Sequence, residues 1–168
     1  QVCLYSLAAK NWKYTSTDSL HGKTFGWIND YGFASDPLDL WVQDNRESDN
    51  IMIIAGTNVH QRLFKLMQLG RIDTFAEDRN VIAFELKKAG IEKTIQLAGC
   101  LQTVDKVHIA FSLKSAHKED WANALDKGIM LLRKSGQLDN ILSVYGLTID
   151  SWLGKSPNSS VIFKDKTK

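Results

Sequence analysis

Short apolar runs alternate with amphipathic segments along most of the chain. The apolar runs have the length of β-strands and predict strands at 2–7, 24–29, 51–55, 72–76, 94–98 and 107–113. The amphipathic segments carry apolar residues at helical spacing and predict helices from Pro37, between Asn58 and Gly70, between Asp78 and Gly90, and at 115–134 and 138–145. Strands that alternate with helices favour β-α-β crossovers. The sequence therefore predicts an α/β fold with a mostly parallel sheet covered on both faces.

Length, charge and hydropathy narrow the class of protein. The chain has 168 residues, of which 43% are hydrophobic, which is enough for one globular core. Its 21 basic and 19 acidic residues give a net charge of +2, and this balance does not point to a nucleic-acid partner. No apolar run reaches the length of about 18 residues that a membrane-spanning helix needs.

The two cysteines leave two interpretations open. Cys3 and Cys100 each lie in an apolar run, and neither belongs to a C-x-x-C pair. They can be two small buried hydrophobic residues. They can also form a disulfide, if their strands adjoin and the compartment is oxidising.

Motifs for catalysis or cofactor binding are incomplete. Gly22-Lys23-Thr24 lacks the earlier glycine of a phosphate loop and precedes a strand instead of opening a helix. His117-Lys118-Glu119 lacks the cysteine pair of a zinc deaminase, and the four histidines show no metal-ligand spacing. We therefore predict no catalytic residue, metal site or cofactor.

Three strand-to-helix turns are candidate ligand sites, because ligands of open parallel sheets bind beyond the carboxyl ends of the strands. The turn 29–35 contains the candidates Asp30, Gly32, Phe33 and Ser35, and either holds a ligand or is a plain capped turn. In the second turn, Thr57 can contact a ligand or serve as a helix cap. In the third, Asp78 can pair with a ligand ammonium or cap the following helix.

Four segments resemble one known family. They are residues 69–78 (LGRIDTFAED), 18–26 (DSLHGKTFG), 107–112 (VHIAFS) and 121–146, and they come in the family's order. They are similar to segments of the family 3 extracellular solute-binding proteins, the polar amino-acid receptors of bacterial ABC importers. The resemblance implies a periplasmic-binding-protein fold of type II, with two α/β lobes joined by two crossing segments and closing on a ligand.

The resemblance also implies how this chain is divided. Residues 1–113 would form the second lobe with both crossover strands, 114–146 the two C-terminal helices that normally pack on the first lobe, and 147–168 a polar tail. The first lobe would be missing. An apolar stripe on the first of these helices would then pack on the sheet lobe, exchange with a neighbour or form a homodimer; it consists of Trp121, Leu125, Ile129 and Leu132.

Site residues follow from the same resemblance. Asp78 matches the acid that receives the α-ammonium of the ligand. Gly32 matches a turn that faces the ligand carboxylate, although Phe33 and Ala34 stand where the family has serine or threonine, and Ser35 comes later. With Asp30 and Asp78 at the mouth, a ligand carrying a cationic group would fit better.

The implied function is extracytoplasmic, periplasmic binding of a small polar solute such as an amino acid for uptake through an ABC-transporter permease. Binding would be weak without the first lobe. The alternative is the ligand-sensing domain of a bacterial signalling receptor. In both cases the chain would be a binding protein and not an enzyme.

Overall fold

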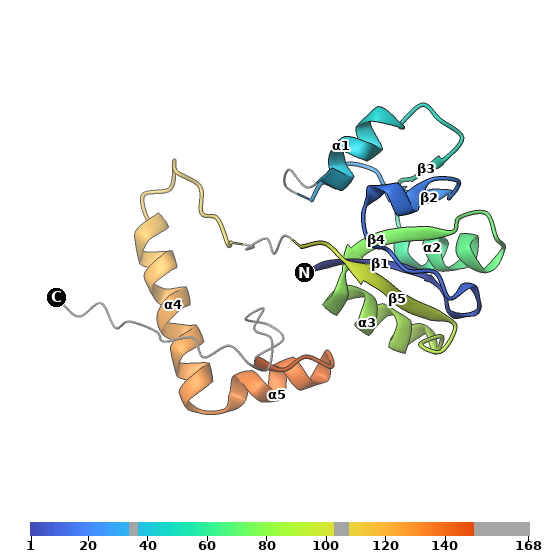
Figure 1. Ribbon diagram of the computed structural model, residues 1–168. Helices are drawn as coiled ribbons and strands as arrows, with labels where there is room; N and C mark the ends of the chain where they lie inside the picture. The colour runs from blue at the N-terminus through green and yellow to red at the C-terminus, as the bar shows by residue number, and fades with distance from the viewer. Residues whose placement is uncertain (34–36, 103–107, 150–168) are drawn as a thin grey trace. The chain divides into compact units, whose positions relative to one another are not determined.

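The computed structural model of the chain describes residues 1–33, 37–102 and 108–149. The chain divides into two compact units, here called the sheet unit (Gln1–Lys106) and the helical unit (Val107–Lys168). Figure 1 shows the sheet unit in blue to yellow-green and the helices of the helical unit in orange. Each unit has its own internal structure.

The described part of the sheet unit contains a five-stranded sheet. Its strands are β1 (Val2–Leu7), β2 (Phe25–Ile28), β3 (Ile51–Ile54), β4 (Thr74–Asp78) and β5 (Ile95–Cys100), in the order β3-β2-β4-β1-β5. β2 pairs in parallel with β3 and β4, whereas β1 pairs antiparallel with β4 and β5. Four strands therefore run one way and β1 runs the other way. The predicted α/β class is confirmed, and the sheet is mixed.

The first strand shows how the sheet is buried on both faces. Its side chains alternate, so that Cys3 and Tyr5 join one core cluster while Leu4 joins the other. None of these three residues is more than 4% exposed. A strand covered on both faces reads as a continuous apolar run, which explains why the sequence pattern at 2–7 is strong.

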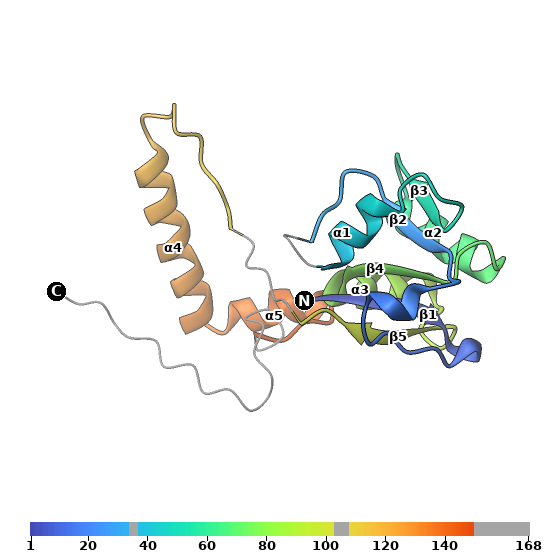
Figure 2. The same ribbon diagram turned by 45° about the horizontal axis from the view of Figure 1, so that its top comes forward.

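Helices cover the two faces unequally (Figures 1 and 2). The helices α2 (Val59–Gln68) and α3 (Arg79–Ala89) lie on the face of Cys3 and Tyr5, where they pack around Phe75. Their buried contacts come from Leu63, Phe64, Met67, Ile82 and Leu86. On the other face lies α1 (Pro37–Asp44), whose Leu38 and Val42 join the cluster of Phe25 and Trp27.

The connection between β1 and β2 covers the rest of the α1 face. It contains the short 3-10 helix η2 (Thr17–Leu20), and Leu20 is buried in the same cluster as α1. Earlier in the same connection, before η2, the Tyr14 N–H donates to the carbonyl of Ala98 at 3.1 Å. Gly99 is required at this crossing because a Cβ there would collide with the Tyr14 carbonyl oxygen.

The helical unit contains α4 (Lys118–Lys134) and α5 (Gln137–Val144), which pack on each other. Gly136 separates them with a φ of +72°, a conformation that favours glycine. Both helices agree with the sequence prediction to within three residues. In α4 the ring of Trp121 is half exposed, and Leu125, Ile129 and Leu132 are partly buried.

The predicted strand at 107–113 is wrong over the residues that the structure describes. Residues 108–113 form no strand, and Val107 lies outside the described residues. Ile109 is 68% exposed and Leu113 is 85% exposed, and no described strand pairs with this segment. A short apolar run becomes a strand only with a pairing partner, and this run has none in the described part of the chain.

Candidate functional site

The three predicted ligand turns lie at one edge of the sheet. They follow β2, β3 and β4, which are parallel neighbours in the order β3-β2-β4, so their carboxyl ends meet. We call this the carboxyl edge and define it by residues 29–33, 55–58 and 77–79. The sheet therefore brings together Asp30, Gly32, Thr57 and Asp78 at one end of the strands, as the argument from parallel strands predicted.

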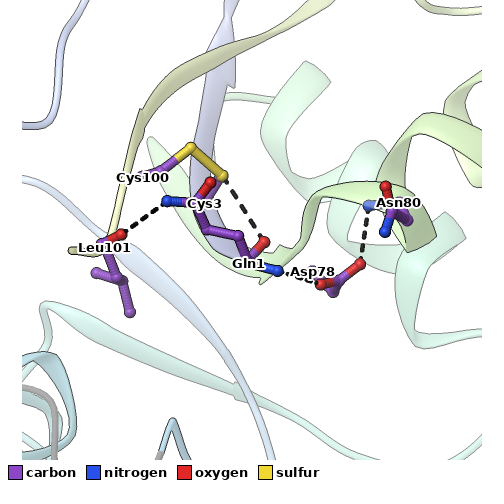
Figure 3. The surroundings of a disulfide bond; sticks show 6 residues. All are labelled: Gln1, Cys3, Asp78, Asn80, Cys100 and Leu101. Carbon is purple, nitrogen blue, oxygen red and sulfur yellow. Dashed lines mark hydrogen bonds and ion pairs between the residues drawn. A yellow bond between two sulfur atoms is a disulfide. The ribbon is translucent and has the colours of Figure 1, made fainter. Parts of the chain in front are cut away.

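Asp78 ends β4 and precedes α3. Its Oδ1 accepts from the backbone N–H of Asn80 at 2.8 Å and of Val81 at 3.4 Å, so it is the N-cap of α3. Its Oδ2 accepts from the amino group of Gln1 at 2.9 Å (Figure 3). The side chain remains 35% exposed. The two roles considered for Asp78 are compatible, because the helix cap uses only Oδ1 and leaves Oδ2 outside it.

Glu77 is a buried acid beside Asp78. It is 5% exposed, and its Oε2 lies 2.9 Å from Nε2 of His60 in the first turn of α2. Its Oε1 accepts from the backbone N–H of Asp78 at 2.8 Å. A buried carboxylate needs such partners because desolvation penalises its charge. The His60–Glu77 pair thus ties α2 to the backbone that carries Asp78.

The turn after β2 lies close to this pair. The Glu77 carboxylate, with a smaller contribution from burial, raises the pKa of Tyr31 above its ordinary value. Tyr31 is 43% exposed at the carboxyl edge. Asp30 precedes it with a φ of +62°, a left-handed conformation that aspartate tolerates better than most residues.

Gly32 and Phe33 occupy different environments in the same turn. The Phe33 ring is 6% exposed and packs edge-on against Trp27, with ring centroids 5.3 Å apart. The Phe33 N–H donates to both carboxylate oxygens of Asp39, at 3.0 and 2.8 Å. Gly32 remains exposed. Phe33 therefore anchors the turn through the core, and Gly32 is the part of it that a solute can reach.

A cavity of about 150 Å³ lies beside this turn. It is lined by Trp27, Asp30, Tyr31, Gly32, Asp39, Val42, Gln43 and Arg46. Of the predicted site residues it brings together Asp30 and Gly32. Thr57 and Asp78 do not line it, and Thr57 is exposed in the turn after β3. Ser35 lies outside the described residues.

Sequence reasoning did not find the His60–Glu77 pair or Tyr31. The sequence pattern ended the strand at residue 76 and left Glu77 in the turn after it, whereas β4 runs to Asp78 and buries Glu77. Nothing in the sequence linked it to His60, which is 17 residues earlier. In the described ranges no group of three His, Cys, Asp or Glu side chains is arranged to hold a metal ion. No described helix is long and apolar enough to cross a membrane.

Comparisons with known proteins give matches among solved structures. No family and no curated protein matches the sequence. A mutant of ArgBP from T. maritima is 16% identical, with a TM-score of 0.56 over 92% of this chain and 58% of that protein. The amino acid ABC transporter substrate-binding protein AbpA from Streptococcus pneumoniae, bound to L-arginine, is 16% identical, with a TM-score of 0.56 over 86% of this chain and 56% of that protein.

A third match is the GluR0 ligand-binding core from Nostoc punctiforme in complex with L-glutamate, which is 14% identical. Its TM-score is 0.58 over 86% of this chain and 60% of that protein. The chain has the fold of amino-acid-binding proteins. It spans between 56% and 60% of the length of these three proteins, so it corresponds to part of their structure. The resemblance to the family 3 binding proteins is confirmed at the level of fold.

Proposed function

We propose that the sheet unit supplies one side of a binding site for a small polar solute, an amino acid or a related compound, that is taken up through an ABC-transporter permease. The shared fold supports this, since AbpA is an amino acid ABC transporter substrate-binding protein bound to L-arginine. Because the chain spans 56–60% of such proteins, we expect its own affinity to be low. The proposed role is binding without catalysis.

The observation that carries the proposal is the second carboxylate oxygen of Asp78. Oδ1 caps α3, whereas Oδ2 takes no part in the cap and the side chain is 35% exposed. A carboxylate oxygen has two lone pairs, so Oδ2 can accept a further N–H from a solute ammonium. Asp30 and Tyr31 lie on the neighbouring turn and add a carboxylate and a phenol. We therefore propose that a solute with an ammonium or another cationic group binds here.

An extracytoplasmic, periplasmic location is part of this proposal. The described residues contain a disulfide between Cys3 and Cys100, and disulfides persist mainly in oxidising compartments. The alternative function is ligand sensing, which the similarity to the GluR0 ligand-binding core favours. The two functions share the same binding chemistry. They differ in whether the protein with its bound solute acts on a transporter permease or on a signalling receptor.

Replacing Asp78 by asparagine is expected to weaken solute binding at least about tenfold while leaving the free energy of unfolding nearly unchanged. Asparagine is as good an N-cap as aspartate but lacks the charge that attracts an ammonium group. Asp78→Ala removes both the helix cap and the charge, so it should also cost about 1 kcal/mol of stability. Solute binding is measured by NMR titration with arginine, glutamine and putrescine, and stability by urea unfolding.

Asp49→Asn is the matched control, because Asp49 is exposed and precedes β3 at the other end of the strands. Asp49→Asn should leave solute binding and the free energy of unfolding unchanged. If none of the three solutes shifts the signals of residues at the carboxyl edge, the proposed function is wrong. If the asparagine variant binds as well as the unchanged protein, Asp78 is a helix cap only.

We also propose that the apolar surface of the helical unit forms a contact between copies of the chain. Trp121 is 50% exposed in α4, and Leu131 on the same helix is 67% exposed. Large exposed apolar side chains on a helix can supply such a contact. Light scattering across a concentration series is expected to show dimers, and Leu131→Glu is expected to shift them to monomers. A mass that stays monomeric at all concentrations contradicts the contact.

A further inference from the structure

A second cavity, of about 390 Å³, lies at the opposite end of the strands from the carboxyl edge. Lys23 and Asp73 on its wall precede the parallel strands β2 and β4, and Ser6 lies near the end of the antiparallel strand β1. All its lining residues belong to the sheet unit. Cavities between about 300 and 1,000 Å³ are the size that holds small molecules. The function proposed above makes no use of this cavity.

Three lysines line the cavity from two separate segments. The 3-10 helix η1 (Ala8–Lys10) turns the chain back at the end of β1, and Lys10, Trp12 and Lys13 line the cavity. Lys23 comes from the other side, just before β2. In the described part of the chain, none of these three ammonium groups makes an ion pair.

One carboxylate faces these lysines, and it has a backbone partner. Oδ2 of Asp73 accepts from the N–H of Thr24 at 3.0 Å. The cavity wall therefore carries two positive charges in excess. Such an excess, concentrated on one concave surface, attracts an anion of matching charge.

The third feature is a buried hydroxyl group without a partner. Ser6 is 1% exposed and lines the cavity, and its Oγ has no hydrogen-bond partner among the described residues. In the sheet register Ser6 lies between Thr74 of β4 and Gln96 of β5. Thr74 Oγ1 and Gln96 Nε2 are the other two unpartnered buried side-chain atoms in the described ranges. All three thus fall in one row across the sheet.

Such a row needs an explanation, because native proteins leave few buried polar atoms without a partner. Ser6 occupies a position where the same strand face otherwise carries Leu4, in an apolar cluster. An apolar residue at position 6 would complete that cluster. A hydroxyl at this place, on the wall of a cavity with three lysines, is instead suited to donate to an oxygen atom of a bound anion.

We propose that this cavity binds a small phosphate monoester, with its phosphate held by Lys10, Lys13, Lys23 and the Ser6 hydroxyl and its organic group against Trp12. A phosphate monoester carries a charge of about −1.5 to −2 at neutral pH, which matches the excess of two positive charges. Lysines bind phosphate as point charges, whereas a carboxylate would leave one of these charges uncompensated. The cavity has room for an organic group beyond the phosphate, and the half-buried Trp12 offers it a flat apolar surface.

The test is an NMR titration of the full chain with phenyl phosphate, followed through the indole N–H of Trp12 and the backbone N–H of Ser6. We expect saturable shifts confined to the cavity residues, weaker binding of inorganic phosphate, and weaker binding of benzoate. Absence of saturation at both reporters overturns the proposal. Benzoate binding as tightly as phenyl phosphate overturns the assignment to phosphate, and inorganic phosphate binding as tightly overturns the role of Trp12.

Two triple variants separate the site from general charge. K10Q/K13Q/K23Q is expected to bind phenyl phosphate at least about tenfold more weakly, because it removes the three charge-assisted contacts. K65Q/K87Q/K88Q removes the same charge from α2 and α3 on the other face of the sheet and is expected to bind as the unchanged chain does. If both triple variants bind phenyl phosphate equally weakly, the ligand is attracted by general positive charge, and this result would contradict the proposal. Five of the six lysines are exposed and Lys23 is half-buried, so both variants are expected to fold, which circular dichroism checks.

Ser6→Ala is expected to change stability and phosphate affinity in opposite directions. The unliganded variant should unfold at a higher urea concentration, because an unpaired buried hydroxyl is removed, while its affinity for phenyl phosphate falls. A variant with unchanged affinity shows that Ser6 takes no part. Asp78→Asn should leave phenyl phosphate binding unchanged, so failure of this site and failure of the solute site are distinguishable.

Discussion

Removing the Cys3–Cys100 disulfide is expected to lower the free energy of unfolding by about 4 kcal/mol. The bridge joins residues 97 positions apart, and closing so long a loop strongly restricts the unfolded chain. The two cysteines face each other in the register of β1 and β5. β5 is an edge strand of the described sheet and pairs with β1, so the bridge fastens it at its C-terminal end (Figure 3).

The measurement is urea unfolding of C3A/C100A beside the unchanged chain, each with and without dithiothreitol. The reductant should destabilise the unchanged chain to about the level of the double variant and leave the double variant where it is. A loss below about 1 kcal/mol contradicts the expectation, because a bridge over so long a loop should contribute more than that. A reductant effect on the variant that lacks both cysteines would show that something other than the disulfide is being measured.

The disulfide also bears on the candidate site. Val2 lies opposite Asp78 in the register of β1 and β4, one residue from Cys3. Gln1 donates from its side chain to the carbonyl of Leu101 at 3.1 Å and from its amino group to Asp78. The bridge thus holds the start of β1 against the strand that carries Asp78. We expect its loss to weaken solute binding as well as stability.

The sequence pattern predicted which segments are strands and helices better than how the strands are arranged. The apolar run at 2–7 and the helix ends at Gly70 and Gly90 are local signals, and the structure has β1 and the ends of α2 and α3 there. The direction of β1 is not a local property. It depends on the pairing of Val2 with Asp78 and of Cys3 with Cys100, between residues far apart in the chain.

The same distinction explains the site. Parallel neighbours place the turns after β2, β3 and β4 at one edge whatever their exact order, so Asp30, Thr57 and Asp78 could be grouped in advance. The disulfide stayed open because it required knowing that β1 and β5 adjoin. Asn58 marks the start of α2 correctly, since it is the N-cap residue, but its φ is +54° and its side chain makes no capping hydrogen bond.

His60→Ala is expected to cost about 3 kcal/mol of stability. Glu77 is 5% exposed, and without His60 its carboxylate would keep only the N–H of Asp78 as a described partner on its Oε1. An unpaired buried charge is far more costly than the loss of a surface ion pair. The free energy of unfolding from urea titrations measures the effect.

His117→Ala is the control, because His117 and Asp120 form an ion pair whose side chains are 70% and 80% exposed, at a distance of 3.6 Å. Its removal should change stability by no more than about 0.5 kcal/mol. If His60→Ala is as mild as this control, the buried pair does not hold α2 to β4.

A double-mutant cycle with His60→Leu and Glu77→Leu isolates the coupling between the two side chains. Each single variant leaves one polar partner buried alone, whereas the double variant removes both, so it should be more stable than the sum of the two single losses predicts. Solute binding should respond differently. Because Glu77 accepts the N–H of Asp78, the double variant should recover stability but not affinity. Recovery of both would mean that Glu77 has no part in positioning Asp78, and that the pair serves the fold alone.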